Sequence, residues 1–166
     1  ASGGTSFGLW RKNTRDNDGN GHFDSDSDGV DVHRHFGFAW GWDNAGSSPD
    51  PTDQTYRGPA AFSEPEARAQ RDLVSTLAPK TALTFHSFAD MTLHAWGYRD
   101  DIVPGDIDAL HEWSDEMTRD NGYQSGTGAR ALYLTNGDFD DWCYGDTLAK
   151  PRTWAWTPEI GSSDDG

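Results

Sequence analysis

Residues 63–88 read SEPEARAQRDLVSTLAPKTALTFHSF and contain a helix followed directly by a strand. Ser63 is placed to cap this helix and Glu66 to close a capping box, with Pro65 between them in the first helical turn. Pro79 then ends the helix. The last seven residues of the stretch alternate between apolar and polar side chains, as a half-buried strand does. The stretch therefore indicates a chain in which helices and strands alternate.

The same alternation continues toward the C-terminus. Further strands are predicted over residues 92–98, 129–135 and 152–158, and a short one around residues 7–10. Further helices are predicted after residues 104–106 and over residues 138–145. Residues 43–59 are predicted to form a long surface loop. Strands that alternate with helices predict an α/β fold with a mixed, twisted sheet flanked by helices. No internal repeat or linker divides residues 1–166, so one domain is expected.

The chain is strongly acidic. It has 28 acidic and 13 basic residues among 166, which gives a formal net charge of −15. Phosphates would be repelled by such a surface, so we expect no nucleic-acid partner. This acidity suits a secreted protein, a salt-adapted one or one that binds cations. No apolar run reaches the length that spans a bilayer, so no membrane partner is expected.

Three side chains with metal-binding chemistry are expected to have structural or surface roles only. Cys143 follows Trp142 and is interpreted as a packed thiol, and a single cysteine rules out an intrachain disulfide. His94 lies in a predicted strand. His111 lies on a predicted helix, where we expect it to be exposed.

Two residues have the chemistry of a hydrolytic metal site. His86 lies in the extended run 84–88, and Glu159 lies in the run 157–161. A catalytic zinc needs three protein ligands and an acid–base carboxylate, and a neutral imidazole at a strand end is a good zinc ligand. No His-x-x-Glu pair occurs in residues 1–166. On spacing alone, other roles remain possible. His86 could be a strand histidine that is satisfied by hydrogen bonds, and Glu159 could be an ordinary surface glutamate.

An ordered series of short motifs runs the length of the chain. Its members are LWRKN at residues 9–13, GVDVHRHF at 29–36, TYRGPAAFSEPE at 55–66, HSF at 86–88, WGY at 96–98, GDFDDW at 137–142 and PEIG at 158–161. Taken in order, they resemble the second half of a zinc carboxypeptidase of the A/B/T type, and most closely its secreted bacterial members. The resemblance implies a zinc-carboxypeptidase-like α/β/α domain, a zinc cofactor and a secreted, extracellular protein.

The resemblance also implies roles for single residues. His86 matches the third zinc ligand of the family, and Glu159 matches the glutamate that acts as a base toward water and then as an acid toward the leaving amine. Arg11 matches the arginine that polarises the scissile carbonyl and stabilises the oxyanion. Arg34 matches the arginine that grips the terminal carboxylate of the substrate. Tyr133 matches the mobile tyrosine that closes over the bound substrate.

Two further positions bear on substrate binding. The family has Asn before its carboxylate-binding arginine, whereas this chain has His33, which can donate one hydrogen bond but is larger. Asp140 matches the floor of the specificity pocket, where an aspartate implies Lys or Arg at the substrate's C-terminus. Two alternatives stay open. Either Asp140 simply caps the helix over residues 138–145, or a one-residue shift places Asp141 at the pocket floor.

Residues 16–28 carry a separate, acidic signal. The spacing Asp-x-Asp-x-Asn-Gly is typical of a calcium loop, in which oxygen ligands at alternate positions wrap a hard cation. The candidate ligands are Asp16, Asp18, Asn20, Asp24, Asp26 and Asp28. The glutamate that usually ends such a loop is missing. A solvated acidic loop without an ion is the alternative.

In the family, a His-x-x-Glu segment upstream of this region carries the first two zinc ligands. Residues 1–166 are therefore predicted to be a partial peptidase catalytic domain, with a peptide or protein C-terminus as substrate and a complementary N-terminal half as partner. Alone, its strands would leave an exposed edge and an open apolar face. The predicted activity is zinc-dependent removal of C-terminal residues. A catalytically inactive module that binds peptide termini or calcium is the alternative.

Overall fold

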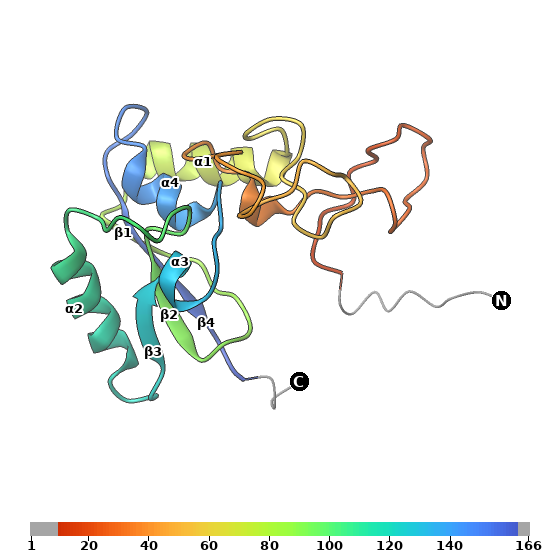
Figure 1. Ribbon diagram of the computed structural model, residues 1–166. Coiled ribbons are helices and arrows are strands. Elements are labelled where there is room, and N and C mark those ends of the chain that lie inside the picture. The colour runs from red at the N-terminus through yellow and green to blue at the C-terminus, as the bar shows by residue number, and fades with distance from the viewer. Residues whose placement is uncertain (1–9, 163–166) are drawn as a thin grey trace.

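The computed structural model describes residues 10–162, which form a four-stranded sheet with helices on both faces (Figure 1). The strands are β1 (Thr81–Leu83), β2 (Met91–His94), β3 (Gln124–Thr127) and β4 (Trp154–Glu159), and their order in the sheet is β1-β4-β2-β3. β4 pairs in parallel with β1 and antiparallel with β2, and β2 pairs in parallel with β3. The predicted α/β fold with a mixed sheet is confirmed.

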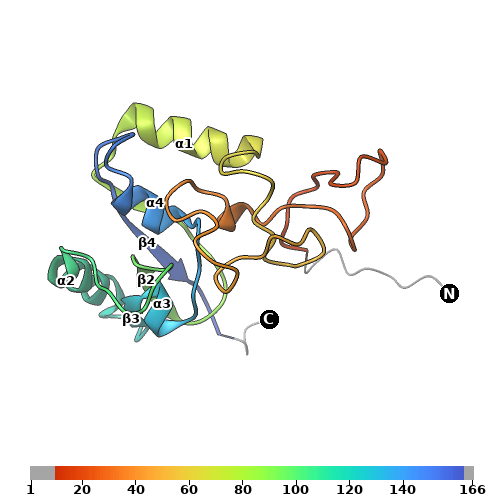
Figure 2. The ribbon, with the colours of Figure 1, turned by 45° about the horizontal axis from the view of Figure 1, so that its top comes forward.

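The two faces of the sheet carry different helices. α1 (Pro65–Leu77) and α4 (Phe139–Gly145) lie on one face, and α2 (Ile107–Thr118) lies on the other (Figure 1, Figure 2). Successive residues of a strand point to opposite faces. Accordingly, Ala155 of β4 belongs to the apolar cluster under α1 and α4, and Trp156 belongs to the cluster under α2. β4 is therefore the strand around which both halves of the core are built.

Helix α1 begins as expected, but its cap differs from the prediction. The N-cap residue is Glu64 and not Ser63, and its side chain makes no capping hydrogen bond. Pro65 occupies the first turn, where its missing N–H costs nothing. The Ser63 hydroxyl instead donates to the Glu64 carboxylate at 2.7 Å. The predicted capping box was wrong because the helix begins one residue later and the Ser63 hydroxyl bonds to Glu64 and His35 rather than to the helix end.

The strand predicted over residues 129–135 was wrong. The strand in this region is β3, which ends at Thr127, and residues Gly128–Ala131 form a single helical turn, α3. β3 pairs residue by residue with β2 up to the contact of Thr127 with His94, where β2 itself ends. Beyond that point the chain has no neighbouring strand to pair with, and its Ala, Arg and Leu residues favour helix.

The strands predicted over residues 82–88 and 92–98 are shorter than expected. β1 ends at Leu83, but the chain stays beside β4, since the His86 N–H donates to the Pro158 carbonyl at 2.9 Å. A single β-bridge joins His86 to Glu159. The extended pattern therefore continues past the regular strand and holds His86 next to the last residue of β4.

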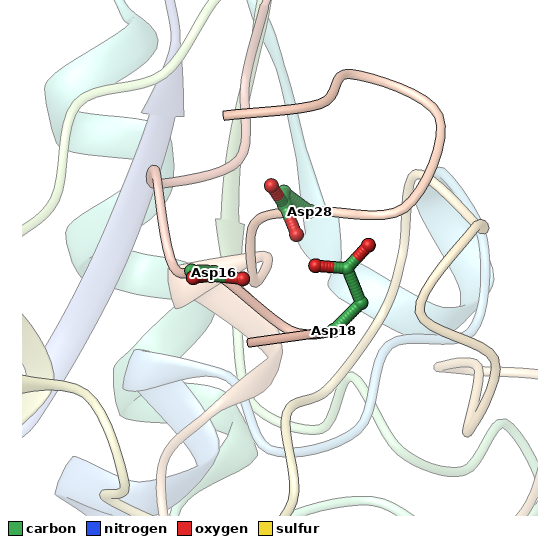
Figure 3. A group of neighbouring side chains, drawn as sticks. All are labelled: Asp16, Asp18 and Asp28. Atoms are coloured by element: carbon green, nitrogen blue, oxygen red, sulfur yellow. The ribbon is translucent and has the colours of Figure 1, made fainter. Parts of the chain in front are cut away.

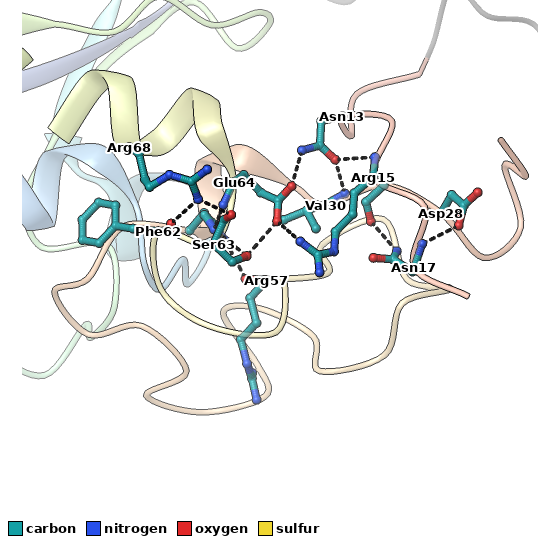
Figure 4. A network of polar contacts seen from close by, with 12 residues as sticks. Asn13, Arg15, Asn17, Asp28, Val30, Arg57, Phe62, Ser63, Glu64 and Arg68 are labelled. Atoms are coloured by element: carbon teal, nitrogen blue, oxygen red, sulfur yellow. Dashed lines mark hydrogen bonds and ion pairs between the residues drawn. The ribbon is translucent and has the colours of Figure 1, made fainter. Parts of the chain in front are cut away.

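Residues 10–62 wrap the α1 end of the molecule as long loops. Within this range the one helix or strand is a 3-10 turn, Val32–Arg34. Glu64 anchors these loops, because its carboxylate accepts from the Asn13 amide at 2.9 Å and from the Arg15 guanidinium at 2.8 Å (Figure 4). Asn13 Oδ1 in turn accepts from the Val30 N–H at 2.8 Å. This network fixes the segments on either side of it, which carry Arg11 and Arg34.

The β1 side of the sheet carries exposed apolar residues. β1 is an edge strand in the described part of the chain, and Leu83 is 48% exposed. Phe85 and Phe88, which follow it, are 64% and 59% exposed. The exposed edge and apolar face that we expected are thus present. No helix within residues 10–162 is long and apolar enough to cross a bilayer.

Candidate active site

An open cleft of about 550 Å³ brings together residues from distant parts of the sequence. Among the predicted site residues, the cleft is lined by Arg11, His33, His86, Tyr133 and Glu159. An adjoining pocket of about 40 Å³ is lined by the same residues and also by Arg34 and Asp140. All the predicted catalytic, zinc-binding and substrate-binding residues therefore surround one connected site, apart from the acidic loop.

His86 and Glu159 form the centre of this site. The His86 Nδ1 atom lies 3.6 Å from Glu159 Oε1, which is too long for a hydrogen bond. Burial lowers the pKa of His86, so its imidazole is neutral at pH 7 and offers a nitrogen lone pair to a metal. The residues present thus include one imidazole beside one carboxylate, two side chains that fit a catalytic zinc centre.

Glu159 is the last residue of β4 and is only 8% exposed. Burial raises the pKa of its carboxylate, and the charges of Arg11 and Arg34 oppose this rise. A desolvated carboxylate holds a proton more strongly and is a better general base. The position at the end of a strand, against the half-buried His86, is what removes this side chain from water.

Asp31 links the two arginines of the site, and sequence reasoning missed it. Its Oδ2 atom accepts from the Arg11 guanidinium at 2.9 Å and lies 4.0 Å from Arg34 Nε. Asp31 is also the N-cap of the turn that carries Arg34, because its Oδ1 accepts from the His33 N–H at 3.1 Å. The signal was present in the sequence, since an aspartate directly before a short turn is a common cap.

Arg34 is buried beside the cleft without a full set of partners. Its side chain is 2% exposed, and its Nε atom has no hydrogen-bond partner. The aromatic ring of Tyr133, which is half exposed, lies over it with 5.7 Å between the ring centre and the guanidinium carbon. A planar guanidinium with an unused N–H is suited to an anionic ligand such as a carboxylate.

His33 contacts the candidate zinc ligand directly. Its ring centre lies 4.2 Å from that of His86, and the two planes meet at 69° in an edge-to-face arrangement. Burial lowers the pKa of His33 well below its usual value, with His86 and the site arginines acting in the same direction. His33 is therefore neutral, and its ring occupies the space directly beside His86.

Asp140 is buried at the small pocket. The Thr157 hydroxyl donates to its Oδ2 atom at 2.7 Å, and its Oδ1 atom has no hydrogen-bond partner. Burial raises the pKa of Asp140 well above its usual value, and the nearby Asp138 charge adds to the shift. Asp138, and not Asp140, caps α4 by accepting from the Asp141 N–H at 2.7 Å.

Asp141 is committed to a structural role. Its two carboxylate oxygens accept from the backbone N–H groups of Gly97 and Tyr98, each at 2.9 Å. Of the two adjacent aspartates that sequence reasoning considered, Asp140 is the one with an oxygen atom left unpaired.

The acidic loop lies apart from the cleft and lines neither it nor the small pocket. Ligand oxygens of Asp16, Asp18 and Asp28 lie within 4.8 Å of one another (Figure 3). Asp28 is fully buried and accepts from the backbone N–H groups of Asn17 and Asp24, both at 2.8 Å. Of the remaining candidate ligands, Asp24 and Asp26 lie outside this group of three. The Asn20 side-chain amide donates to Asp18 Oδ2 at 2.9 Å.

Residues 3–165 match the zinc carboxypeptidase family model. This chain belongs to the zinc carboxypeptidase family. It is 34% identical over 125 residues to carboxypeptidase B of Astacus astacus, and 34% identical over 106 residues to carboxypeptidase B of Homo sapiens. These alignments cover 71% and 60% of this chain, but only 40% and 25% of the relatives.

Solved zinc carboxypeptidase structures show the same fold. Bovine thrombin-activatable fibrinolysis inhibitor in complex with tick carboxypeptidase inhibitor superposes with a TM-score of 0.75 at 26% identity, covering 93% of this chain and 51% of that one. Carboxypeptidase A from Helicoverpa armigera gives a TM-score of 0.73 at 27% identity, covering 92% and 37%. The chain thus spans about half or less of the zinc carboxypeptidases that it matches.

Proposed function

We propose that this chain supplies the C-terminal part of the active site of a zinc-dependent metallocarboxypeptidase, which removes C-terminal residues from peptides. The single observation that carries the proposal is the position of Glu159. Its partly desolvated carboxylate lies 3.6 Å from the His86 imidazole, in a cleft that is also lined by Arg11. A base, a metal ligand and a donor for an oxyanion are the three groups that hydrolysis of an amide needs.

His86 is the residue of this chain that would hold zinc. When bound, zinc acts as a Lewis acid on the scissile carbonyl. A catalytic zinc takes three protein ligands, so two more are needed beside His86. We assign them to an upstream His-x-x-Glu segment, which makes this chain a partial catalytic domain. The partial coverage of the relatives supports this, as do the exposed Phe85 and Phe88 beside the β1 edge.

The remaining residues bind and orient the substrate. Glu159 takes a proton from the attacking water and passes it to the leaving amine nitrogen. Arg11 donates to the carbonyl oxygen as negative charge develops there. Arg34, which lines the small pocket, binds the terminal carboxylate through its guanidinium, with His33 beside it, and Tyr133 moves over the bound residue.

The substrate preference is assigned to Asp140. An ionised carboxylate with an unpaired, buried oxygen is costly unless a cation pairs with it. A Lys or Arg side chain at the substrate's C-terminus provides that cation, so we propose a preference for basic C-terminal residues. The open cleft adjoins this pocket, because Arg11, His33 and Glu159 line both.

The test uses the catalytic unit that contains residues 1–166 together with the upstream segment. We expect one zinc per molecule and release of C-terminal Lys from a model peptide, with Asp140→Ala lowering the ratio of Lys to Leu release. A sample that binds zinc and peptide but releases no residue of any type would overturn the activity. It would favour the alternative, an inactive module that binds peptide termini.

Calcium is proposed as a structural cofactor of the acidic loop. The converging oxygens of Asp16, Asp18 and Asp28 support it, since calcium takes oxygen ligands of this kind. The ion would tether the segment between Arg11 and Arg34. We also propose that the protein acts outside the cell, a location that its net charge of −15 suits. Detection of the protein only in a cell-associated fraction would contradict the location.

A further inference from the structure

His94 of β2 and His111 of α2 form a histidine pair on the sheet face opposite α1 and α4. The register partner of His94 is Trp156, whose side chain packs under α2. The His94 side chain lies on the same face, where its ring approaches that of His111. His94 is 1% exposed, whereas His111 is exposed. A buried and an exposed imidazole therefore meet where β2 and α2 pack together.

The hydrogen bonding of His94 leaves one ring nitrogen unused. Its Nδ1 atom lies 2.8 Å from the Ala95 carbonyl oxygen. A carbonyl can only accept, so Nδ1 carries the proton and Nε2 carries a lone pair. Nε2 is buried and has no hydrogen-bond partner. A histidine that donates one ring N–H to a backbone carbonyl and keeps the other nitrogen unpaired is the usual arrangement of a metal ligand.

The geometry of the two rings suits a shared ion. Their centres are 5.0 Å apart and their planes meet at 59°. A zinc–nitrogen bond is about 2.0–2.1 Å long, and the ring centre lies roughly 1.1 Å further on, so two imidazoles on one tetrahedral zinc have centres about 5 Å apart. Burial lowers the pKa of His94 to about 4, which keeps its lone pair available at neutral pH.

Acidic residues of α2 surround His111, the exposed member of the pair. His111 lies in an open cleft of about 520 Å³ whose other lining residues are Asp108, Glu112, Asp115, Glu116 and Arg119. Asp115 is four residues after His111, so both lie on one helix face. Its Oδ1 atom accepts from the Ser125 hydroxyl at 2.6 Å. Four carboxylates against one guanidinium give this cleft a negative potential that attracts cations.

We propose that His94 Nε2 and His111 bind one divalent transition-metal ion, with zinc the best fit to two imidazoles and a carboxylate. Within residues 10–162, the one preformed group of three such ligands is Asp16, Asp18 and Asp28. That group does not include the histidine pair, so the third protein ligand is not preformed here. We assign it to Asp115, whose side chain must first rotate away from Ser125, and water completes the tetrahedron. Because the ion joins β2 to α2, its role is structural.

The experiment is a Co²⁺ titration of the 166-residue chain followed by visible absorption, with His86→Ala as the background so that the active-site imidazole takes no part. We expect the absorption bands of tetrahedral Co²⁺, one ion per chain, and displacement by Zn²⁺. Adding His111→Ala, at an exposed position, should weaken binding about tenfold or more. His22→Ala, which removes an exposed histidine from the acidic loop, is the matched control and should leave the affinity unchanged.

Two outcomes would overturn the proposal. Equal Co²⁺ affinity with and without His111 means that the pair does not bind the ion, and equal weakening by His22→Ala means that surface histidines bind it non-specifically. A second measurement tests the role of His94, which is buried, without substituting it. Addition of Zn²⁺ should shift the ring nitrogen NMR signals of His94, and unshifted signals count against the site. Because His86 is absent, none of these results depends on carboxypeptidase activity.

Discussion

Glu159 Oε1 lies 3.6 Å from His86 Nδ1 at the end of β4, with a backbone β-bridge but no side-chain hydrogen bond between the two residues. The bridge fixes both main chains, so the side chains are held close together while each keeps its functional atoms unpaired. A metal ligand and a general base need this combination, because a hydrogen bond between them would occupy the lone pairs that each must use.

Replacing the base should remove catalysis and spare metal binding. In the unit that contains the upstream segment, Glu159→Gln is expected to lower kcat by about 10²–10⁴-fold, the usual contribution of a positioned general base. Zinc content, measured by mass spectrometry of the native protein, should stay unchanged because His86 is intact. Glu66→Gln, at an exposed position on α1, is the control and should retain full activity. Wild-type turnover by Glu159→Gln would rule out the assigned base.

Asp140→Asn is expected to stabilise the chain at neutral and alkaline pH. Burial raises the pKa of Asp140, so the folded state keeps this proton to a higher pH than the unfolded chain does. Stability from this group is present below about pH 4, the unfolded pKa, and is lost as pH rises toward the folded pKa. Since Asn cannot ionise, we expect a gain of about 1–3 kcal/mol at pH 8 and none near pH 4.

Denaturant unfolding at several pH values checks this expectation. Asp72→Asn, at an exposed position on α1, serves as the control and should show no pH-dependent gain. A gain for Asp140→Asn that is equally large at pH 4 and pH 8 would mean that ionisation of Asp140 is not its cause.

Gly137→Ala should destabilise the fold next to Arg34. Gly137 has φ +71°, and a Cβ atom there would lie 2.6 Å from the Arg34 carbonyl oxygen. Gly122 has a similar φ of +74° but nothing within 4 Å, so Gly122→Ala reports the backbone strain alone. We expect about 1–2 kcal/mol for Gly122→Ala and about 1–3 kcal/mol more for Gly137→Ala. Thermal or denaturant unfolding measures both losses of stability. Equal losses for Gly137→Ala and Gly122→Ala would show that the Arg34 backbone shifts to accommodate the added Cβ at no cost.

Calcium should raise the melting temperature of the chain through the acidic loop. An ion that binds only the folded state adds about 2.7 kcal/mol at a concentration 100 times its Kd. Chelation is expected to lower the melting temperature, and Asp28→Asn should abolish the difference, because Asp28 is the buried member of the group. Identical melting curves with chelator and with added calcium would leave the loop as a solvated acidic segment.

Local patterns predicted the regular elements that are long or clearly terminated. The helices that became α1, α2 and α4 and the strand that became β4 lie close to the expected residues, because apolar spacing, Pro65 and the turn at Gly122 act within a few residues. The pattern failed over residues 129–135. Whether that segment is a strand depends on where β2 ends, which no local signal contains.

The order of the motifs determined the identity of the site residues, and the tertiary structure determined how they are connected. The chain alone contains the imidazole of His86 and the carboxylate of Glu159 at their places in a family pattern. Only folding brings Asp31 against Arg11, twenty residues away in sequence, and leaves the Nε2 atom of His94 buried without a partner. The physical reason is that residue types and spacing set the chemistry available, whereas strand register and burial decide which atoms meet and which lose water.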